Sequence, residues 1–214
     1  MRQPGPTRRG GSASVIWIVL VGACLAAAFL WTGLYLAGAV PFNGDEAVVG
    51  LMARHILQGA RPVFFYGQAY MGSLDAWLVA AGFVLFGAHV WVIRAVQVVL
   101  YVLIMASTAW LGSLVFRSWK PGVIAAWLLA IPTVNVTLYT TASLGGYGEA
   151  LLIGNLILIL GLLILRRIRA GDKPASLLWL LFGFWIGLGF WANGLTLVYS
   201  IPMIFYLAIA VWQT

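Results

Sequence analysis

Long apolar runs, separated by short polar or basic segments, make up most of this chain. Six of them can be assigned to membrane crossings, at residues 14–40, 90–116, 123–141, 150–165, 177–192 and 195–212. A helix of about 20 apolar residues spans the hydrocarbon core of a bilayer. The pattern therefore predicts an all-α polytopic membrane protein with about six transmembrane helices. These form one transmembrane domain, residues 14–214, which follows a polar cytoplasmic tail at residues 1–13.

The segment 41–89 does not follow this pattern. Its most apolar stretch, residues 74–86, is shorter than the roughly 20 residues that a span needs. We expect 41–89 to form a long outer loop with interfacial or re-entrant helices at 74–86 and 46–58. An alternative with three crossings, in which 74–86 is a tilted short span, requires a span in the region of Arg61, Gln68 and Asp75.

Composition and charge agree with a membrane environment. Of the 214 residues, 63% are hydrophobic and 8% are charged, whereas soluble domains carry about 25% charged residues. The net charge of +7 comes mainly from basic residues before the first run, at 117–120 and at 166–173. Basic clusters of this kind mark cytoplasmic loops. We therefore expect a multi-pass protein of the plasma membrane with a cytoplasmic N-terminus, with membrane lipids and not nucleic acid as its partners.

Most of the chemically active side chains fall on one predicted side of the membrane. Four of the five acidic residues lie on the outer side: Asp45, Glu46, Asp75 and Glu149. Carboxyl groups near lipid are costly and tend to serve a function. On or near the same side lie Arg54, Arg61, Arg94, His55 and His89. The chemistry available to this chain is therefore concentrated at one membrane face.

Several of these groups also have an ordinary structural interpretation. Asp45 and Asp75 each open a predicted helix, where an acid caps backbone N–H groups and interacts favourably with the helix dipole. Arg54 lies opposite Asp45 around the helix and is not placed to pair with it. Glu149 lies in an apolar context, where pairing with a cation such as Arg94 would offset its burial. Arg94 itself could instead extend to lipid headgroups.

The sequence lacks several catalytic signatures. It has no Ser-His-Asp, P-loop or dinucleotide-binding pattern, and His55 and His89 lack the spacing of metal ligands. The absence of these motifs excludes metalloprotease and NTPase functions, and no cofactor is expected. Asp45 and Glu46 are adjacent acids without further predicted ligands, so no metal site is assigned and assistance by a divalent cation is left open.

One set of segments resembles a known family. The segments are 44–47 (GDEA), 53–59 (ARHILQG), 64–68 (FFYGQ), 70–75 (YMGSLD) and 85–87 (LFG), together with Arg94 and the later 145–149 (GGYGE). They resemble the N-terminal part of the GT-C glycosyltransferases, polytopic enzymes that include dolichyl-phosphate-mannose protein mannosyltransferases and bacterial cell-envelope relatives. The resemblance covers about residues 15–195 and is strongest over 43–94.

The resemblance implies an inverting transfer of a sugar from a polyprenyl-phosphate-linked donor to an acceptor at the outer membrane face. It implies that Asp45 is the catalytic base, with Glu46 beside it. Arg54, Arg61 and Arg94 are the candidate phosphate ligands, because the guanidinium fork matches phosphate oxygens. The other candidate substrate-binding residues are His55, Tyr66, Gln68, Tyr70, Asp75 and Glu149. The lipid-linked sugar is the donor substrate, and apolar grooves between spans are expected to hold its prenyl tail.

The length of the chain leaves the function open. GT-C enzymes usually have more spans and often a soluble C-terminal domain, so the chain is expected to be either part of a longer enzyme or a reduced homologue. The alternative function is a non-catalytic accessory or scaffold subunit that binds a membrane-protein partner. A transporter or lipid flippase is a third possibility, which the charge-poor spans disfavour.

Overall fold

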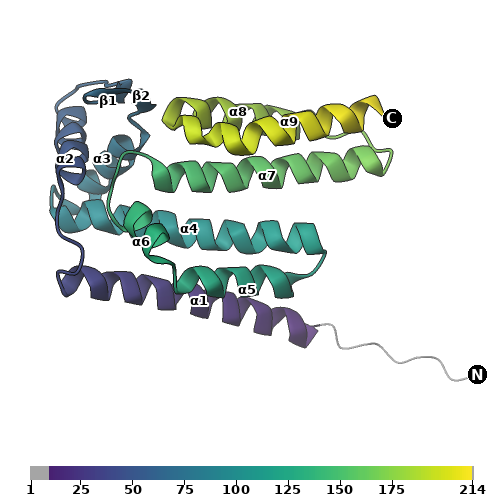
Figure 1. Ribbon diagram of the computed structural model, residues 1–214, viewed down its shortest axis with the longest axis horizontal. Coiled ribbons are helices and arrows are strands. Elements are labelled where there is room, and N and C mark those ends of the chain that lie inside the picture. Colours follow the sequence, from purple (N-terminus) through teal and green to yellow (C-terminus); the bar gives the residue numbers. More distant parts are fainter. Residues whose placement is uncertain (1–9, 214) are drawn as a thin grey trace, which may run out of the picture.

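The fold is a bundle of roughly aligned helices with a group of short elements across one end. The computed structural model describes residues 10–213, with side chains from residue 15. The axial helices are α1 (Gly10–Leu36), α4 (Val90–Phe116), α5 (Trp119–Ala130), α7 (Tyr147–Arg169), α8 (Ser176–Ala192) and α9 (Leu197–Trp212) (Figure 1). The shorter elements are α2 (Gly44–Leu57), β1 (Phe64–Phe65), β2 (Gln68–Gly72), α3 (Leu74–Phe86), α6 (Val134–Thr141) and a 3-10 turn at Gly194–Thr196.

The two ends of the bundle differ in charge. The left-hand end in Figure 1 holds α2, α3 and the starts of α4 and α7. We call it the acid-rich end, defined by Asp45, Glu46, Asp75 and Glu149. The opposite end holds the α4–α5 and α7–α8 connections. We call it the basic end, defined by Arg117, Lys120, Arg166, Arg167, Arg169 and Lys173.

The number of spans is smaller than the sequence pattern predicts. Four helices are long and apolar enough to cross a membrane, at Val15–Leu36, Val90–Phe116, Tyr147–Arg169 and Gly194–Trp212, and the count rises to 5 if one bent pair is a single span. The protein is therefore a multi-pass membrane protein by the length and composition of its helices, but the prediction of about six spans is not confirmed. Helix α8, one of the six, has 17 residues, or about 25 Å against a hydrocarbon core of about 30 Å.

The predicted span at 123–141 is broken. It consists of α5 and α6, whose axes differ by 79°. The break contains Pro132, which lacks a backbone N–H and disfavours helical geometry at the preceding residue. Ile131 accordingly leaves the helix, with φ −119° and ψ 77°. The apolar run alone did not indicate this bend.

The segment 41–89 folds across the acid-rich end, where Figure 1 shows α2 running transverse to the long helices. Helices were expected at 46–58 and 74–86, and α2 and α3 occupy these positions. The all-α description misses a small antiparallel hairpin in which Phe64 pairs with Gly72 and Phe65 with Gln68. Gly67 adopts φ +78° in the turn, a conformation that glycine accepts without a Cβ clash.

The first helix begins earlier and ends earlier than the predicted span at 14–40. It runs from Gly10 to Leu36. Residues 1–9 of the predicted cytoplasmic tail lie outside the described residues.

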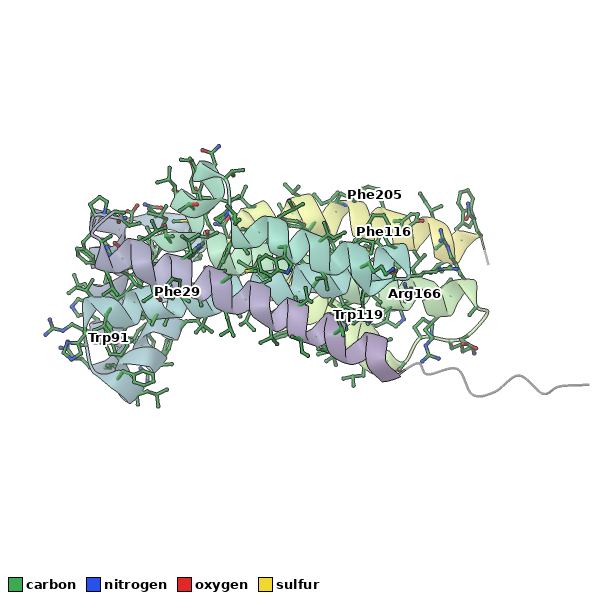
Figure 2. All side chains as sticks on the ribbon, turned by 90° about the horizontal axis from the view of Figure 1, so that it is seen from below. Phe29, Trp91, Phe116, Trp119, Arg166 and Phe205 are labelled. Atoms are coloured by element: carbon green, nitrogen blue, oxygen red, sulfur yellow. The ribbon has the colours of Figure 1, made fainter. Side chains whose placement is uncertain are left out.

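The exterior of the bundle is apolar. Phe29, Phe116 and Phe205 are 82%, 64% and 66% exposed, and Figure 2 shows them on the outside of three different helices. Monomeric soluble proteins rarely expose such continuous apolar surface. A bilayer in contact with these faces explains the exposure.

Buried contacts are divided among three clusters. One joins α2, α3, the hairpin and the start of α4; a second joins α1, α4 and α5; a third joins α7, α8 and α9. Helices α4 and α5 approach closely because glycines face each other, so that a Cβ on Gly112 would lie 2.8 Å from the Cα of Gly122. Small residues permit this packing, which drives helix association in membranes.

We expect Gly122→Ala to destabilise the protein by about 1–3 kcal/mol through overpacking. Its added methyl group would collide with the backbone carbonyl of Ala109, which cannot rotate away. The check is the midpoint of thermal unfolding in detergent. The matched control is Gly183→Ala in α8, where no atom lies within 4 Å of the added Cβ. Equal effects of the two substitutions would contradict the close packing of α4 and α5.

Candidate functional site

The acid-rich end begins with a capped helix. Asn43 is the N-cap of α2, and its Oδ1 accepts a hydrogen bond of 3.0 Å from the backbone N–H of Glu46. The Glu46 Oε2 accepts one of 3.3 Å from the backbone N–H of Asn43. This reciprocal pair is a capping box. Asn43 and Glu46 therefore perform the capping that the sequence interpretation gave to Asp45.

Asp45 is consequently available for other interactions. It lies in the first turn of α2 and is exposed. Its carboxylate has no hydrogen-bond or ion-pair partner within the part of the chain that the structure describes. A solvent-facing carboxylate without a partner can accept a proton from a bound hydroxyl group.

Glu46 instead pairs with Arg94. The Arg94 Nε and Nη2 donate to the two Glu46 carboxylate oxygens, each at 3.3 Å. Glu46 is fully buried and the Arg94 side chain is 12% exposed. Nη2 also donates to the Val40 carbonyl at 3.0 Å, and the guanidinium lies 4.9 Å from the centre of the Tyr35 ring. Arg94 thus joins the end of α1, the start of α2 and α4.

This pairing corrects two earlier interpretations. Arg94 was considered as a partner of Glu149 or as a side chain that extends to lipid headgroups, but its main partner is Glu46. The reason is geometric, since the first turn of α2 lies across the start of α4 and brings the buried carboxylate within reach. The Nη1 of Arg94 has no hydrogen-bond partner among the described residues, so it can still donate to a ligand.

Arg94 lines an apolar groove between α1 and α4. The groove has a volume of about 500 Å³ and is lined mainly by Thr32, Tyr35, Leu36, Val90, Trp91, Arg94, Ala95, Val98 and Val99. Its walls are apolar except at Tyr35, Thr32 and the guanidinium of Arg94. A lipid chain fits such a surface, and the guanidinium offers a donor to an anionic group at its end.

Asp75 belongs to a second, buried cluster. It is 2% exposed; its Oδ1 accepts a 2.9 Å hydrogen bond from the Gln97 amide, and its Oδ2 accepts one from the Ser143 hydroxyl. Burial raises the pKa of Asp75 above its ordinary value, and the hydrogen bonds from Ser143 and Gln97 partly oppose that rise. Asp75 therefore joins α3 to α4 and to the loop before α7. This role is in addition to its position in the first turn of α3, where an acid was expected to stabilise the helix.

Glu149 completes this cluster from the first turn of α7. It is 2% exposed, and its carboxyl group interacts with that of Asp75. The preceding turn approaches Met71 and Asn193 closely, with Gly145 and Gly146 at φ +80° and +106°. Two buried carboxyl groups thus lie together, and neither forms an ion pair with a cation of the described residues.

The remaining predicted site residues lie around the hairpin and make local contacts. The His55 Nδ1 lies 3.2 Å from the Tyr66 hydroxyl, which links α2 to the β1–β2 turn. The Tyr70 hydroxyl donates to Gln68 at 2.9 Å. Arg61 donates to the Ala60 carbonyl at 3.0 Å and lies 5.6 Å from the Trp77 ring. Arg54 is exposed on α2. These residues border the acid-rich end, and the contacts given above do not link them into one cluster.

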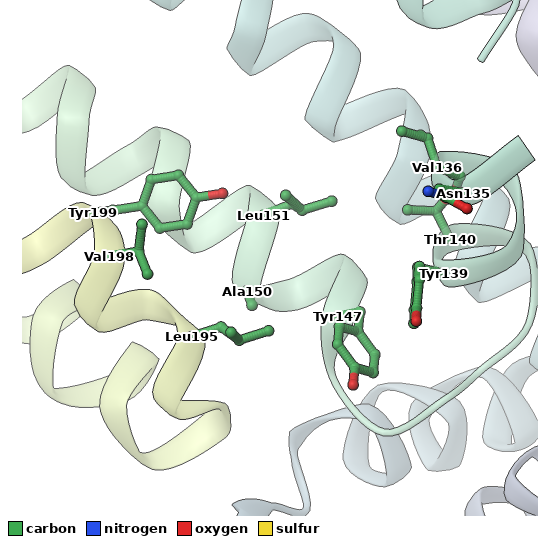
Figure 3. A pocket seen from close by; sticks show the side chains of 10 residues that line it. All are labelled: Asn135, Val136, Tyr139, Thr140, Tyr147, Ala150, Leu151, Leu195, Val198 and Tyr199. Atoms are coloured by element: carbon green, nitrogen blue, oxygen red, sulfur yellow. The ribbon is translucent and has the colours of Figure 1, made fainter. Parts of the chain in front are cut away.

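A separate apolar pocket opens between α6, α7 and α9. It has a volume of about 390 Å³, and its lining contains three tyrosines, Tyr139, Tyr147 and Tyr199. Figure 3 shows Tyr139 and Tyr147 near one end of the pocket, and Tyr199 with Leu151 near the other. No predicted site residue lines it, and it contains no charged side chain.

Sequence reasoning missed Asn43, Gln97 and Ser143. Asn43 had a signal, because Asn followed three residues later by Glu is the pattern of a capping box. Gln97 also had one, since a polar side chain inside an apolar run is costly without a partner. No group of three or more His, Cys, Asp or Glu side chains among the described residues is arranged to hold a metal ion.

No protein-family model, curated protein or solved structure matches this chain. The resemblance to GT-C glycosyltransferases therefore rests on the sequence segments named above.

Proposed function

We propose that this protein transfers a sugar from a polyprenyl-phosphate donor to a hydroxyl acceptor, as the resemblance to GT-C enzymes implies. We also propose that the acid-rich end faces outward from the plasma membrane. The observation that carries this proposal is a single arrangement at that end. Asp45, which is exposed and has no hydrogen-bond or ion-pair partner among the described residues, directly precedes Glu46, which holds Arg94 at the apolar groove between α1 and α4.

In the proposed reaction each of these groups has one role. Asp45 removes the proton from the acceptor hydroxyl. The acceptor oxygen attacks the anomeric carbon from the face opposite the phosphate, and the bond from that carbon to the phosphate oxygen breaks. Polyprenyl phosphate leaves with the bonding electron pair, and the configuration inverts. The Nη1 of Arg94 stabilises the negative charge on the leaving phosphate, while the groove holds the start of the prenyl chain.

The fixed position of Arg94 supports this assignment. Its other donors are occupied by Glu46 and Val40, so the guanidinium is held in place before a ligand arrives. A group held in this way loses less entropy when it binds a transition state. His55, Tyr66 and Arg61 lie near the same end and are proposed to contact the sugar or the acceptor.

Asp45→Asn is expected to lower transfer by at least about 100-fold, the usual contribution of a general base. The assay measures transfer from a panel of polyprenyl-phosphate-linked sugars in detergent. Because the Asp45 side chain makes no hydrogen bond or ion pair within the described residues, the variant should fold and bind farnesyl phosphate normally. Asp172→Asn, at the basic end, is the matched control and should retain full activity. Wild-type turnover by Asp45→Asn would exclude Asp45 as the base.

Binding is tested separately from chemistry. Ala95→Trp fills the groove beside Arg94 but leaves the Arg94–Glu46 pair intact, so farnesyl phosphate binding should fall about tenfold. Native mass spectrometry with farnesyl phosphate, and with farnesol as the uncharged comparison, measures this loss.

The accessory-subunit alternative makes different predictions. It is favoured by the structural use of Glu46, which both caps α2 and neutralises Arg94. In that case, wild-type protein would bind no farnesyl phosphate and would co-purify with a membrane-protein partner in mild detergent.

A further inference from the structure

The basic end carries two adjoining pockets that the proposed function does not use. One has a volume of about 400 Å³ and the other of about 560 Å³. Both are lined by Leu114, Arg117 and Arg166. They lie where the α4–α5 connection meets the end of α7, and Figure 2 shows Arg166 and Trp119 at this end of the bundle.

These pockets have an excess of positive charge. Among the described residues of the basic end there are six cations and one acid, Asp172, which is 3.6 Å from Arg167. Arg117 and Arg166 therefore have no carboxylate partner in the described structure. The Arg166 Nη2 donates to the Leu114 carbonyl at the end of α4, which holds this guanidinium at the pocket and leaves its other N–H groups available.

Two further features favour an anion at this place. Arg117 ends α4 in a left-handed conformation, φ +53°, so the chain turns directly into α5. Ser118 caps α5 through its hydroxyl group and lines the larger pocket. The N-terminus of α5 therefore adds partial positive charge to this pocket.

An apolar pocket continues from the larger basic pocket. It has a volume of about 670 Å³ and is lined by side chains of α1, α4, α5, α7 and α8. Trp110 and Trp119 line both pockets, so the basic and apolar surfaces are continuous. Ala106 and Leu156 lie along the apolar part, and Trp17 contacts Trp119 with ring centres 5.0 Å apart. Tryptophans of this kind lie at membrane–water interfaces.

We propose that this composite surface binds an anionic phospholipid, with its phosphate between Arg117 and Arg166 and one acyl chain along Trp110, Trp119 and Ala106. The combination is what indicates a lipid: a soluble phosphate would use only the basic pockets, whereas the connected apolar pocket matches an acyl chain. Basic pockets between transmembrane helices are known to bind lipid headgroups. This site is independent of the proposed transferase site at the other end of the bundle.

The test is native mass spectrometry of the delipidated full chain, titrated with dioleoyl-phosphatidylglycerol or dioleoyl-phosphatidylcholine. We expect the anionic lipid to bind at least about fivefold more tightly, and Arg117→Gln with Arg166→Gln to lower its affinity about tenfold. Arg117→Gln alone should lower it by a smaller factor, and it breaks no side-chain hydrogen bond or ion pair among the described residues. This single variant keeps the test valid if the double variant folds poorly.

The matched control is Arg167→Gln with Lys173→Gln. It removes the same charge from the same end, but neither residue lines any of these three pockets. An equal loss in this control would show general electrostatic attraction and would overturn the site.

Ala106→Trp, which narrows the apolar pocket, should also weaken binding of phosphatidylglycerol. If glycerol 3-phosphate displaces the lipid, or if Ala106→Trp binds phosphatidylglycerol as tightly as the wild-type protein does, the site binds a soluble anion and the proposal is overturned.

Discussion

Replacing Arg94 with alanine is expected to lower the free energy of unfolding by about 3–5 kcal/mol. The substitution leaves the fully buried Glu46 without its partner, and an isolated buried carboxylate is far less stable than a paired one. It also removes the donor to the Val40 carbonyl and the cation above the Tyr35 ring. Unfolding of detergent-solubilised protein by sodium dodecyl sulfate measures the change.

Two further variants separate charge pairing from simple loss of volume. Glu46→Gln with Arg94→Gln removes both charges and keeps an amide that can complete the capping box, so it should recover a large part of the lost stability. Arg61→Ala removes an exposed arginine and should change the stability by less than about 0.5 kcal/mol. A loss in Arg94→Ala no greater than that in Arg61→Ala would show that the buried pair contributes little.

The positions of most helices follow directly from the sequence. Apolar runs predicted α1, α4, α7, α8 and α9, because a bilayer-facing helix must be apolar around most of its surface. The short run at 74–86 gave the bounds of α3. The bend at Pro132 and the hairpin at 64–72 were missed, since a hydropathy pattern carries no information about backbone direction within an apolar segment.

The pairing of the site residues could not be predicted in the same way. Spacing along one helix identifies neighbours three or four positions apart, but Glu46 and Arg94 are separated by 48 positions and Asp75 and Ser143 by 68. Such contacts depend on how α2 and α3 cross the bundle end. Sequence reasoning therefore placed these charged residues at one end of the protein but assigned Arg94 the wrong partner.

The buried pair Asp75 and Glu149 gives a pH-dependent stability. The pKa of Asp75 is raised in the folded protein by burial, so the folded state holds a proton that the unfolded state releases near the ordinary pKa of 3.8. The stabilisation is complete below that value and is lost as the pH rises through the folded-state pKa. We expect the free energy of unfolding to fall over this range by up to about 1.4 kcal/mol per pH unit for one proton.

Asp75→Asn should remove most of this slope, because the asparagine amide does not titrate and can still accept from Gln97 and contact Ser143.

Glu149→Gln should be more stable than the wild-type protein at pH 8 by about 1–3 kcal/mol. The change replaces a buried carboxyl group beside Asp75 with an uncharged amide that can donate to the Asp75 side chain. Unfolding in detergent at a series of pH values between 4 and 8, about one unit apart, measures both effects. Asp172→Asn, whose carboxylate is exposed in the wild-type protein, should keep the wild-type slope. If the slope persists in Asp75→Asn, Asp75 is not the group that binds the proton.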